Sequence, residues 1–125
     1  MEHIFILLAA FQLKHFIADY PLQTPYMYLN KGAKTDWVLP LSAHAVVHTG
    51  LTMLIIGGYS LNVVPMTLGL FLALSAFDFT THFLTDRWKA TRGVGPDTHA
   101  FWIHLGIDQM LHHVVGIIII YWVVT

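Results

Sequence analysis

The stretch WVLPLSAHAVVHTGLTMLIIGGYSLNVVPMTLGLFLALSAF, residues 37–77, contains no Asp, Glu, Lys or Arg. A helix needs about 20 apolar residues to cross about 30 Å of hydrocarbon, so an uncharged run of this length has room for two crossings. The segment GGYSLNVVP, with its paired glycines and its proline, interrupts the run and indicates a turn. The stretch therefore predicts two membrane helices, over residues 38–58 and 64–87, joined by a short connection.

The composition of the whole chain agrees with a membrane protein. Hydrophobic residues make up 56% of the 125 and charged residues only 10%, and the mean hydropathy is +0.63. Two further apolar segments cover residues 3–20 and 102–124. The first is weaker, because its apolar run IFILLAAF is short and is followed by Lys14, His15 and Asp19, so that alone it also fits an interfacial helix. We expect an all-α integral membrane four-helix bundle, a single four-span domain over residues 1–125.

Basic residues mark one side of this predicted bundle. All six lie at the end of the first span, at the end of the third, or in the connections that follow these ends: Lys14, Lys31, Lys34, Arg87, Lys89 and Arg92. Membrane proteins concentrate such residues in cytoplasmic loops. We therefore expect both termini on the outer side and the two long connections in the cytoplasm.

Net charge and cysteine content narrow the possible functions. A formal net charge of −1 supplies no electrostatic footprint for nucleic acid, so no nucleic-acid partner is expected. The absence of cysteine rules out disulfides, thiolate zinc sites and cysteine nucleophiles. Any metal must be held by nitrogen and oxygen ligands.

Each predicted span carries a pair of polar residues spaced four apart, in the sequences HFIAD, HAVVH, HFLTD and DQMLH. Residues four apart lie on one face of a helix, so both side chains can bind the same ligand. At 1.5 Å per residue, most of these side chains fall within roughly 3–16 Å of the cytoplasmic boundary, in a single layer. One such pair is a weak signal, whereas one in every span is strong. The candidate metal ligands are His15, Asp19, His44, His48, His82, Asp86, Asp108 and His112.

The carboxylates in this layer argue for a metal. An ionised Asp near the bilayer centre costs about 2.5–3.5 kcal/mol, and the cations expected nearby, Lys14 and Arg87, are too few to compensate four of them. A divalent ion fits this set of imidazole and carboxylate groups: zinc first, with iron or manganese as alternatives. The number of ligands allows one metal with Asp–His pairs around it, or two metals in a dinuclear centre, which we favour.

Plainer interpretations remain for some of these residues. His44 and His48 also fit hydrogen-bonded packing between spans, and Asp19 and Asp86 also fit exposure to the headgroup layer. His113 lies about 100° round the helix from His112, so the two cannot serve one site equally, and His112 is preferred because it shares a face with Asp108.

The same blocks carry a family resemblance. The sequences FQLKHFIADYPLQT, NKG, HAVVH, HFLTD and DQMLHH resemble, in this order and over nearly the whole chain, the small bacterial and phage membrane proteins grouped as domain-of-unknown-function family 3307. The resemblance implies a polytopic fold in a bacterial inner membrane and no established activity. A looser likeness to predicted membrane-bound metal-dependent hydrolases transfers no residue role. Lipid phosphatases of the phosphatidic-acid type differ, because Ala76 stands where they place an arginine after the serine.

The leading functional hypothesis is a membrane-embedded metal-dependent hydrolase. Its metal would activate water to attack a lipid-like ester or phosphoester near the cytoplasmic leaflet, with Asp78 as a general base or as a residue that orients a ligand. The expected partners are the lipid bilayer and a membrane-associated substrate, and homo-oligomerisation is left open. Transport of metal ions or protons is an alternative, although the outer half of the spans offers a pathway almost nothing ionisable. A haem-binding electron carrier would explain the histidines but not the carboxylates.

Overall fold

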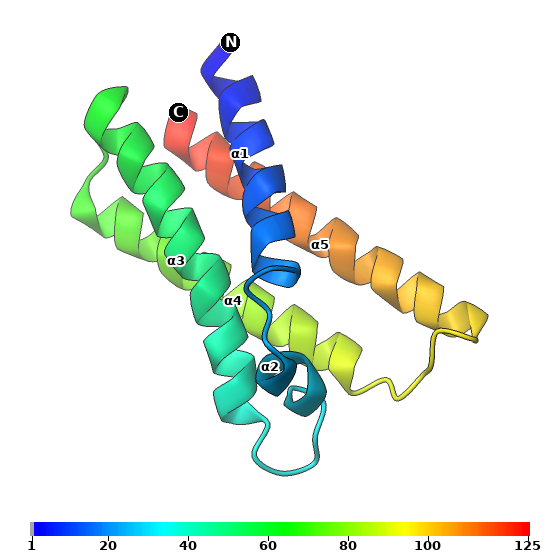
Figure 1. Ribbon diagram of the computed structural model, residues 1–125. Coiled ribbons are helices and arrows are strands. Elements are labelled where there is room, and N and C mark those ends of the chain that lie inside the picture. The colour runs from blue at the N-terminus through cyan, green and yellow to red at the C-terminus, as the bar shows by residue number, and fades with distance from the viewer. Residues whose placement is uncertain (1) are drawn as a thin grey trace.

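The computed structural model describes residues 2–125 and consists of five helices (Figure 1). They are α1 (Glu2–Asp19), α2 (Pro25–Asn30), α3 (Val38–Asn62), α4 (Leu68–Ala90) and α5 (His99–Val124). Within residues 2–125 there is no strand, so the predicted all-α class is confirmed. Three helices, α3, α4 and α5, are long and apolar enough to cross a membrane. Helix α1 does not reach that standard, because its 18 residues include Glu2, Lys14 and Asp19.

The helix ends have local causes. Thr67 and Thr98 each precede a helix in extended conformation, and their hydroxyl oxygens accept the backbone N–H groups of Leu70 and Phe101. Such caps satisfy amides that have no partner within the helix. Pro25 begins the short helix α2, where its missing N–H costs nothing. The predicted spans are shifted accordingly: α3 runs on to residue 62, α4 begins at 68, and α5 begins at 99.

The four long helices form a closed ring in which each contacts two others. Helix α3 packs against α1 and α4, and α5 packs against α4 and α1, while α2 rests on α3. Successive long helices run in opposite directions, so both termini and the short α3–α4 connection lie toward the top of Figure 1. The two longer connections lie toward the bottom, as the chain order requires.

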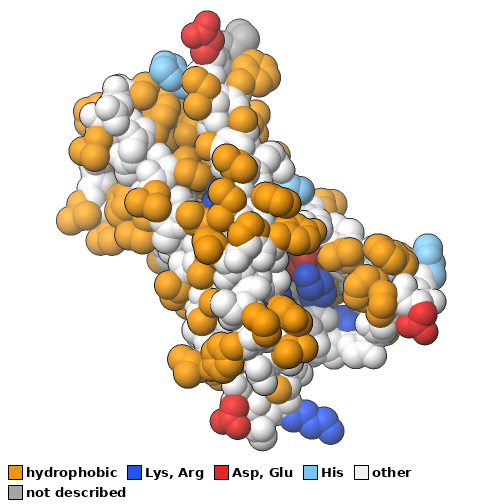
Figure 2. Space-filling view, in the orientation of Figure 1, with side chains coloured by type: hydrophobic (Ala, Val, Ile, Leu, Met, Phe, Trp, Pro, Cys, Tyr) orange, Lys and Arg blue, Asp and Glu red, His pale blue; other side chains and the backbone are white. Residues whose placement is uncertain are grey.

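The interior of this ring has two halves of different chemistry. Toward the termini, the core is apolar and consists of Leu7, Phe11, Ile56, Leu74, Val115, Ile119, Ile120 and Val123. Toward the longer connections, the buried side chains are mostly charged groups and imidazoles. The outer surface is largely hydrophobic, and Figure 2 shows acidic and basic side chains together in a recess where the helices diverge. Large exposed apolar surfaces of this kind suit contact with lipid.

Candidate metal centre

The polar half of the core gathers side chains from all four long helices. The imidazole of His48 on α3 lies 4.1 Å, centre to centre, from that of His82 on α4. The His82 ring lies 4.4 Å from that of His112 on α5, which in turn is 5.3 Å from the ring of His15 on α1. Residues that are far apart in the sequence therefore form one contact cluster.

Three groups within this cluster have the geometry to hold a metal ion. In each group, one potential ligand atom per residue lies within 4.8 Å of those of the other members. The groups are His15, His48 and His82; Asp19, His44 and His48; and Asp86, Asp108 and His112. Together they contain all eight residues whose spacing pointed to metal ligation, and Asp78 lies outside them.

Asp19 is the centre of the second group. Its Oδ1 atom lies 3.0 Å from His48 Nε2 and 3.4 Å from His44 Nε2, and its Oδ2 atom lies 3.1 Å from His15 Nε2. The carboxylate stands at the last residue of α1, where the chain leaves the helix and turns toward α2. The same His44 Nε2 is 3.2 Å from Asp86 Oδ2, so His44 links the second group to the third.

Several buried ligand atoms in the cluster have no hydrogen-bond partner among the described residues. The unpaired atoms are Asp86 Oδ2, Asp108 Oδ1, both ring nitrogens of His112, His82 Nε2, and the Nδ1 atoms of His44 and His48. Asp86 Oδ2 lies 3.2 Å from His44 Nε2, although this contact lacks hydrogen-bond geometry. A buried polar atom without a hydrogen-bond partner costs about 1–3 kcal/mol of folding free energy, so a bound ion or another partner at these atoms would stabilise the fold.

Lysines compensate the three most deeply buried carboxylates. Lys89 Nζ lies 2.6 Å from Asp108 Oδ2, Lys31 Nζ lies 3.0 Å from Asp86 Oδ1, and Lys14 Nζ lies 3.3 Å from Asp78 Oδ1. The charge balance expected from the sequence was therefore wrong: three ammonium groups, rather than Lys14 and Arg87, face the four carboxylates. A metal is not needed merely to neutralise this layer, and the case for one depends on the unpaired atoms.

Arg87 has a structural position away from the cluster. Its guanidinium stacks over the ring of Trp37 at 3.8 Å and donates to the backbone carbonyls of Lys31 and Ala33, at 3.0 and 3.2 Å. These contacts fix the connection between α2 and α3 against the end of α4. Arg87 thereby helps to hold Lys31 in place.

Asp78 occupies the deepest position in the polar half. Its Oδ2 atom accepts the hydroxyl of Thr52 at 3.1 Å, and its carboxylate pairs with Lys14. The backbone carbonyl of Asp78 is 2.9 Å from His82 Nδ1, an arrangement that directs the other ring nitrogen, Nε2, into the cluster. The 2.9 Å contact to His82 involves the backbone of Asp78, while Lys14 and Thr52 engage its carboxylate oxygens, so its role as a general base or as an orienting residue stays a prediction.

Sequence reasoning missed Lys31, Lys89 and Thr52 as members of the site. Lys89 follows His82 and Asp86 on one helical face at spacings of seven and three, a signal that was available. Lys31 lies in the NKG turn, where helical spacing does not apply, and only the fold brings it to Asp86. Of the two neighbouring histidines, His112 is buried, whereas His113 is partly exposed and lies 3.2 Å from Gln12.

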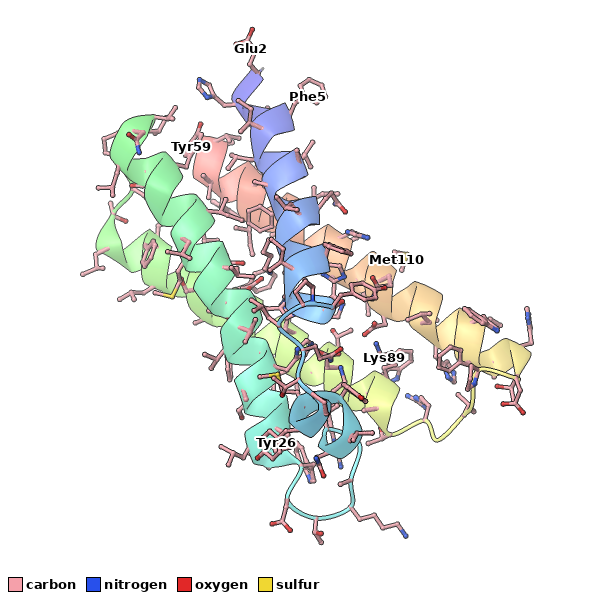
Figure 3. The ribbon with its side chains drawn as sticks, in the orientation of Figure 1. Glu2, Phe5, Tyr26, Tyr59, Lys89 and Met110 are labelled. Atoms are coloured by element: carbon pink, nitrogen blue, oxygen red, sulfur yellow. The ribbon has the colours of Figure 1, made fainter. Side chains whose placement is uncertain are left out.

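A cavity of about 160 Å³ opens beside the cluster, lined by Asp19, Tyr20, Gln23, Lys31, Lys89, Leu105 and Gln109. Figure 3 shows Lys89 reaching between α4 and α5 at this place. Gln109 connects the cavity to the histidines, since its amide oxygen is 2.9 Å from His15 Nε2 and its amide nitrogen donates to Asp108 Oδ2 at 3.1 Å. The cavity therefore gives a polar approach to the cluster.

Comparison with known proteins assigns the chain to a family without a known activity. The family model described as "Protein of unknown function (DUF3307)" matches residues 7–125. No curated protein and no solved structure matches the chain. The match covers nearly all of the sequence, including each of the eight clustered His and Asp residues, and the chain therefore belongs to the DUF3307 family.

Proposed function

We propose that the His and Asp cluster binds divalent metal, zinc in the first place, and that the protein is a membrane-embedded metal-dependent hydrolase. The observation that carries the proposal is the set of unpaired buried atoms on Asp86, Asp108 and His112. Two carboxylate oxygens and an imidazole nitrogen, all within 4.8 Å of one another, form a typical ligand set for zinc, iron or manganese. Without cysteine, no thiolate competes for this role.

The lysines support metal binding rather than oppose it. Lys31 and Lys89 each hold one oxygen of a carboxylate, Asp86 Oδ1 and Asp108 Oδ2, while the other oxygen accepts no hydrogen bond from the described residues. A carboxylate fixed on one side by an ammonium group has its second oxygen oriented before any ion arrives. The two lysines therefore hold the carboxylates of Asp86 and Asp108 in position to bind a metal ion.

Two of the three groups lie close enough to favour a dinuclear centre. His44 approaches both Asp19 and Asp86, and so stands between the second group and the third. Two metals about 3.5–4 Å apart can stabilise both the attacking and the leaving oxygen of a displacement. His15 and His82 add imidazoles at the edge of these groups.

Hydrolysis is the chemistry that this set of residues fits best. A divalent ion lowers the pKa of a bound water from about 15.7 to about 7, which supplies a nucleophile without any Ser or Cys. A site within a hydrophobic exterior favours a substrate that is itself in the membrane, such as a lipid-like ester or phosphoester.

The proposal includes a membrane topology. Helix α1 is the fourth span: although less apolar than the others, it packs against α3 and α5 and carries its charged residues Lys14 and Asp19 on the inside of the ring. The basic residues then orient the longer connections toward the cytoplasm and both termini outward, in the inner membrane of a bacterium. The metal centre lies in the cytoplasmic half of the bilayer.

The two other hypotheses from the sequence receive less support. A transport pathway needs polar groups through the whole bilayer, whereas apolar side chains fill the half of the ring near the termini. Haem would have to fit between histidines whose ring centres are only 4.1 and 4.4 Å apart. We therefore propose neither.

Elemental analysis of the purified full-length protein tests the metal centre. We expect stoichiometric zinc, iron or manganese in the wild type, a loss of most of it in Asp108→Asn and in His48→Ala, and retention in the control His99→Ala, whose side chain is exposed. Hydrolysis of fluorogenic ester and phosphoester lipids should disappear with chelator and return with zinc. Folded wild-type protein that binds none of these metals would remove the basis of the proposal.

A further inference from the structure

Net charge decides which substrates the proposed centre can accept. Four carboxylates, of Asp19, Asp78, Asp86 and Asp108, meet the three ammonium groups of Lys14, Lys31 and Lys89, which leaves one negative charge when the imidazoles are neutral. One divalent ion reverses this to a net charge of +1, and two raise it to +3. A buried site with excess positive charge favours an anionic ligand over a neutral one.

The cavity beside the cluster carries donors for such an anion. Lys31 and Lys89 both line it, and each ammonium group has three N–H donors of which only one is needed for its carboxylate. Lys89 is the more accessible, with 26% of its side chain exposed against 9% for Lys31. With its amide oxygen toward Lys31, Gln23 accepts from Nζ at 2.9 Å and donates to the backbone carbonyl of Asp19 at 3.0 Å, which fixes this wall of the cavity.

The size of the cavity limits what it can hold. At about 160 Å³ it is well below the roughly 300–1,000 Å³ of pockets that enclose drug-sized ligands. It therefore suits one small charged group, with any apolar part of the molecule outside it. Tyr20, at the rim, has 71% of its surface exposed. A substrate with a compact anionic head and an external tail satisfies both conditions.

We propose that this cavity is a phosphate subsite, in which Lys31 and Lys89 bind the phosphate group of the substrate beside the metal centre. Lysine serves well as a point charge for phosphate, whose oxygens accept from several donors at once. The inference deepens the proposed function and depends on it, because the excess positive charge comes from the metal. The phosphate could belong to a lipid headgroup or to a soluble phosphate compound, and the chemistry of the cavity is common to both.

Binding to the metal-loaded full-length protein in phosphatidylcholine nanodiscs tests the subsite. Inorganic phosphate and dihexanoyl phosphatidic acid are titrated separately by calorimetry, with the metal content measured on the same samples. Compared with the wild type at equal measured metal content, we expect Lys89→Gln to weaken phosphate binding about tenfold or more and Lys89→Arg to bind nearly as the wild type does, while the exposed control Lys34→Gln changes nothing. Lys31→Gln provides a second variant if Lys89→Gln does not fold.

The outcomes separate the subsite from the metal centre. Preference for the short-chain lipid identifies a headgroup, whereas equal or better binding of inorganic phosphate identifies a soluble source. Metal-loaded protein that binds neither probe, or that binds them equally well after Lys89→Gln and Lys31→Gln, overturns the subsite and leaves the metal centre intact. Wild-type protein without metal would instead remove the proposed function itself.

Discussion

At the scale of single residues, the two oxygens of a buried carboxylate in this site can have different contacts. In Asp86 and in Asp108, one carboxylate oxygen contacts a lysine and the other accepts no hydrogen bond from the described residues. Asp78 differs, because Lys14 and Thr52 together engage its carboxylate. The first two aspartates can therefore act as ligands, while the third is a fixed negative charge that must be balanced within the core.

The pair of Lys14 and Asp78 gives a prediction on stability. Their side chains are only 4% and 1% exposed, so Lys14→Met would leave the carboxylate buried without its counter-ion. We expect this change to lower the free energy of unfolding by about 3–5 kcal/mol, because losing one partner of a buried pair strands the other charge. Thermal unfolding of the purified protein in detergent, followed by circular dichroism, measures the loss.

A second substitution identifies the cause of that loss. Adding Asp78→Asn to Lys14→Met removes the stranded charge and should recover a substantial part of the stability, whereas the exposed lysine in Lys34→Met should change it by less than about 0.5 kcal/mol. A double variant no more stable than Lys14→Met alone would show that the ion pair is not the reason.

Whole elements show what the sequence could predict and what it could not. Hydropathy located α3, α4 and α5, and two of the pairs spaced four apart, His44 with His48 and Asp108 with His112, each fall within one group. The pairs HFIAD and HFLTD are each divided between two groups. The six-residue helix α2 was missed, since fewer than two turns contain too few residues for a periodic pattern. The role of Lys31, which directly follows α2, was missed as well, because it depends on a contact with Asp86 on α4, far from Lys31 in the sequence. Local spacing carries no information about such contacts.

The turn that follows α2 packs closely against the end of α4, and this packing depends on Gly32. A Cβ atom built at Gly32 would lie 2.8 Å from the backbone oxygen of Ala90, closer than real Cβ atoms come. Because the obstacle is backbone, Gly32→Ala must move the chain, and we expect a loss of about 1–3 kcal/mol. Hydrogen exchange should quicken in residues 20–36, and thermal unfolding should occur at a lower temperature.

Gly50→Ala is the matched control for this change. Gly50 lies within α3 with no atom within 4 Å of a built Cβ, so alanine should be neutral or stabilise the helix by up to about 1 kcal/mol. If Gly32→Ala were as well tolerated as Gly50→Ala, with unchanged exchange in residues 20–36, the close contact with Ala90 would not matter for stability.

At the scale of the whole molecule, the core has an apolar half and a polar half, so the site opens toward one end of the helix bundle. Apolar side chains close the ring near the termini, and the cavity of about 160 Å³ opens at the other end, among Lys31, Lys89 and Gln109. Under the proposed function, substrate and metal would enter from the side of the longer connections. The orientation of the chain in its membrane decides which compartment, or which leaflet, supplies them.

Cysteine labelling tests this orientation, and the chain suits it because it contains no native cysteine. We expect a membrane-impermeant maleimide to modify Asn62→Cys and Thr125→Cys in intact spheroplasts, since these positions lie near the short connection and the C-terminus. Lys34→Cys and Thr91→Cys, in the longer connections, should react only after lysis, because the positive-inside tendency places them in the cytoplasm. The reverse pattern would turn the site toward the outer leaflet, and labelling of Thr125→Cys from the side opposite to Asn62→Cys would contradict the four-span bundle.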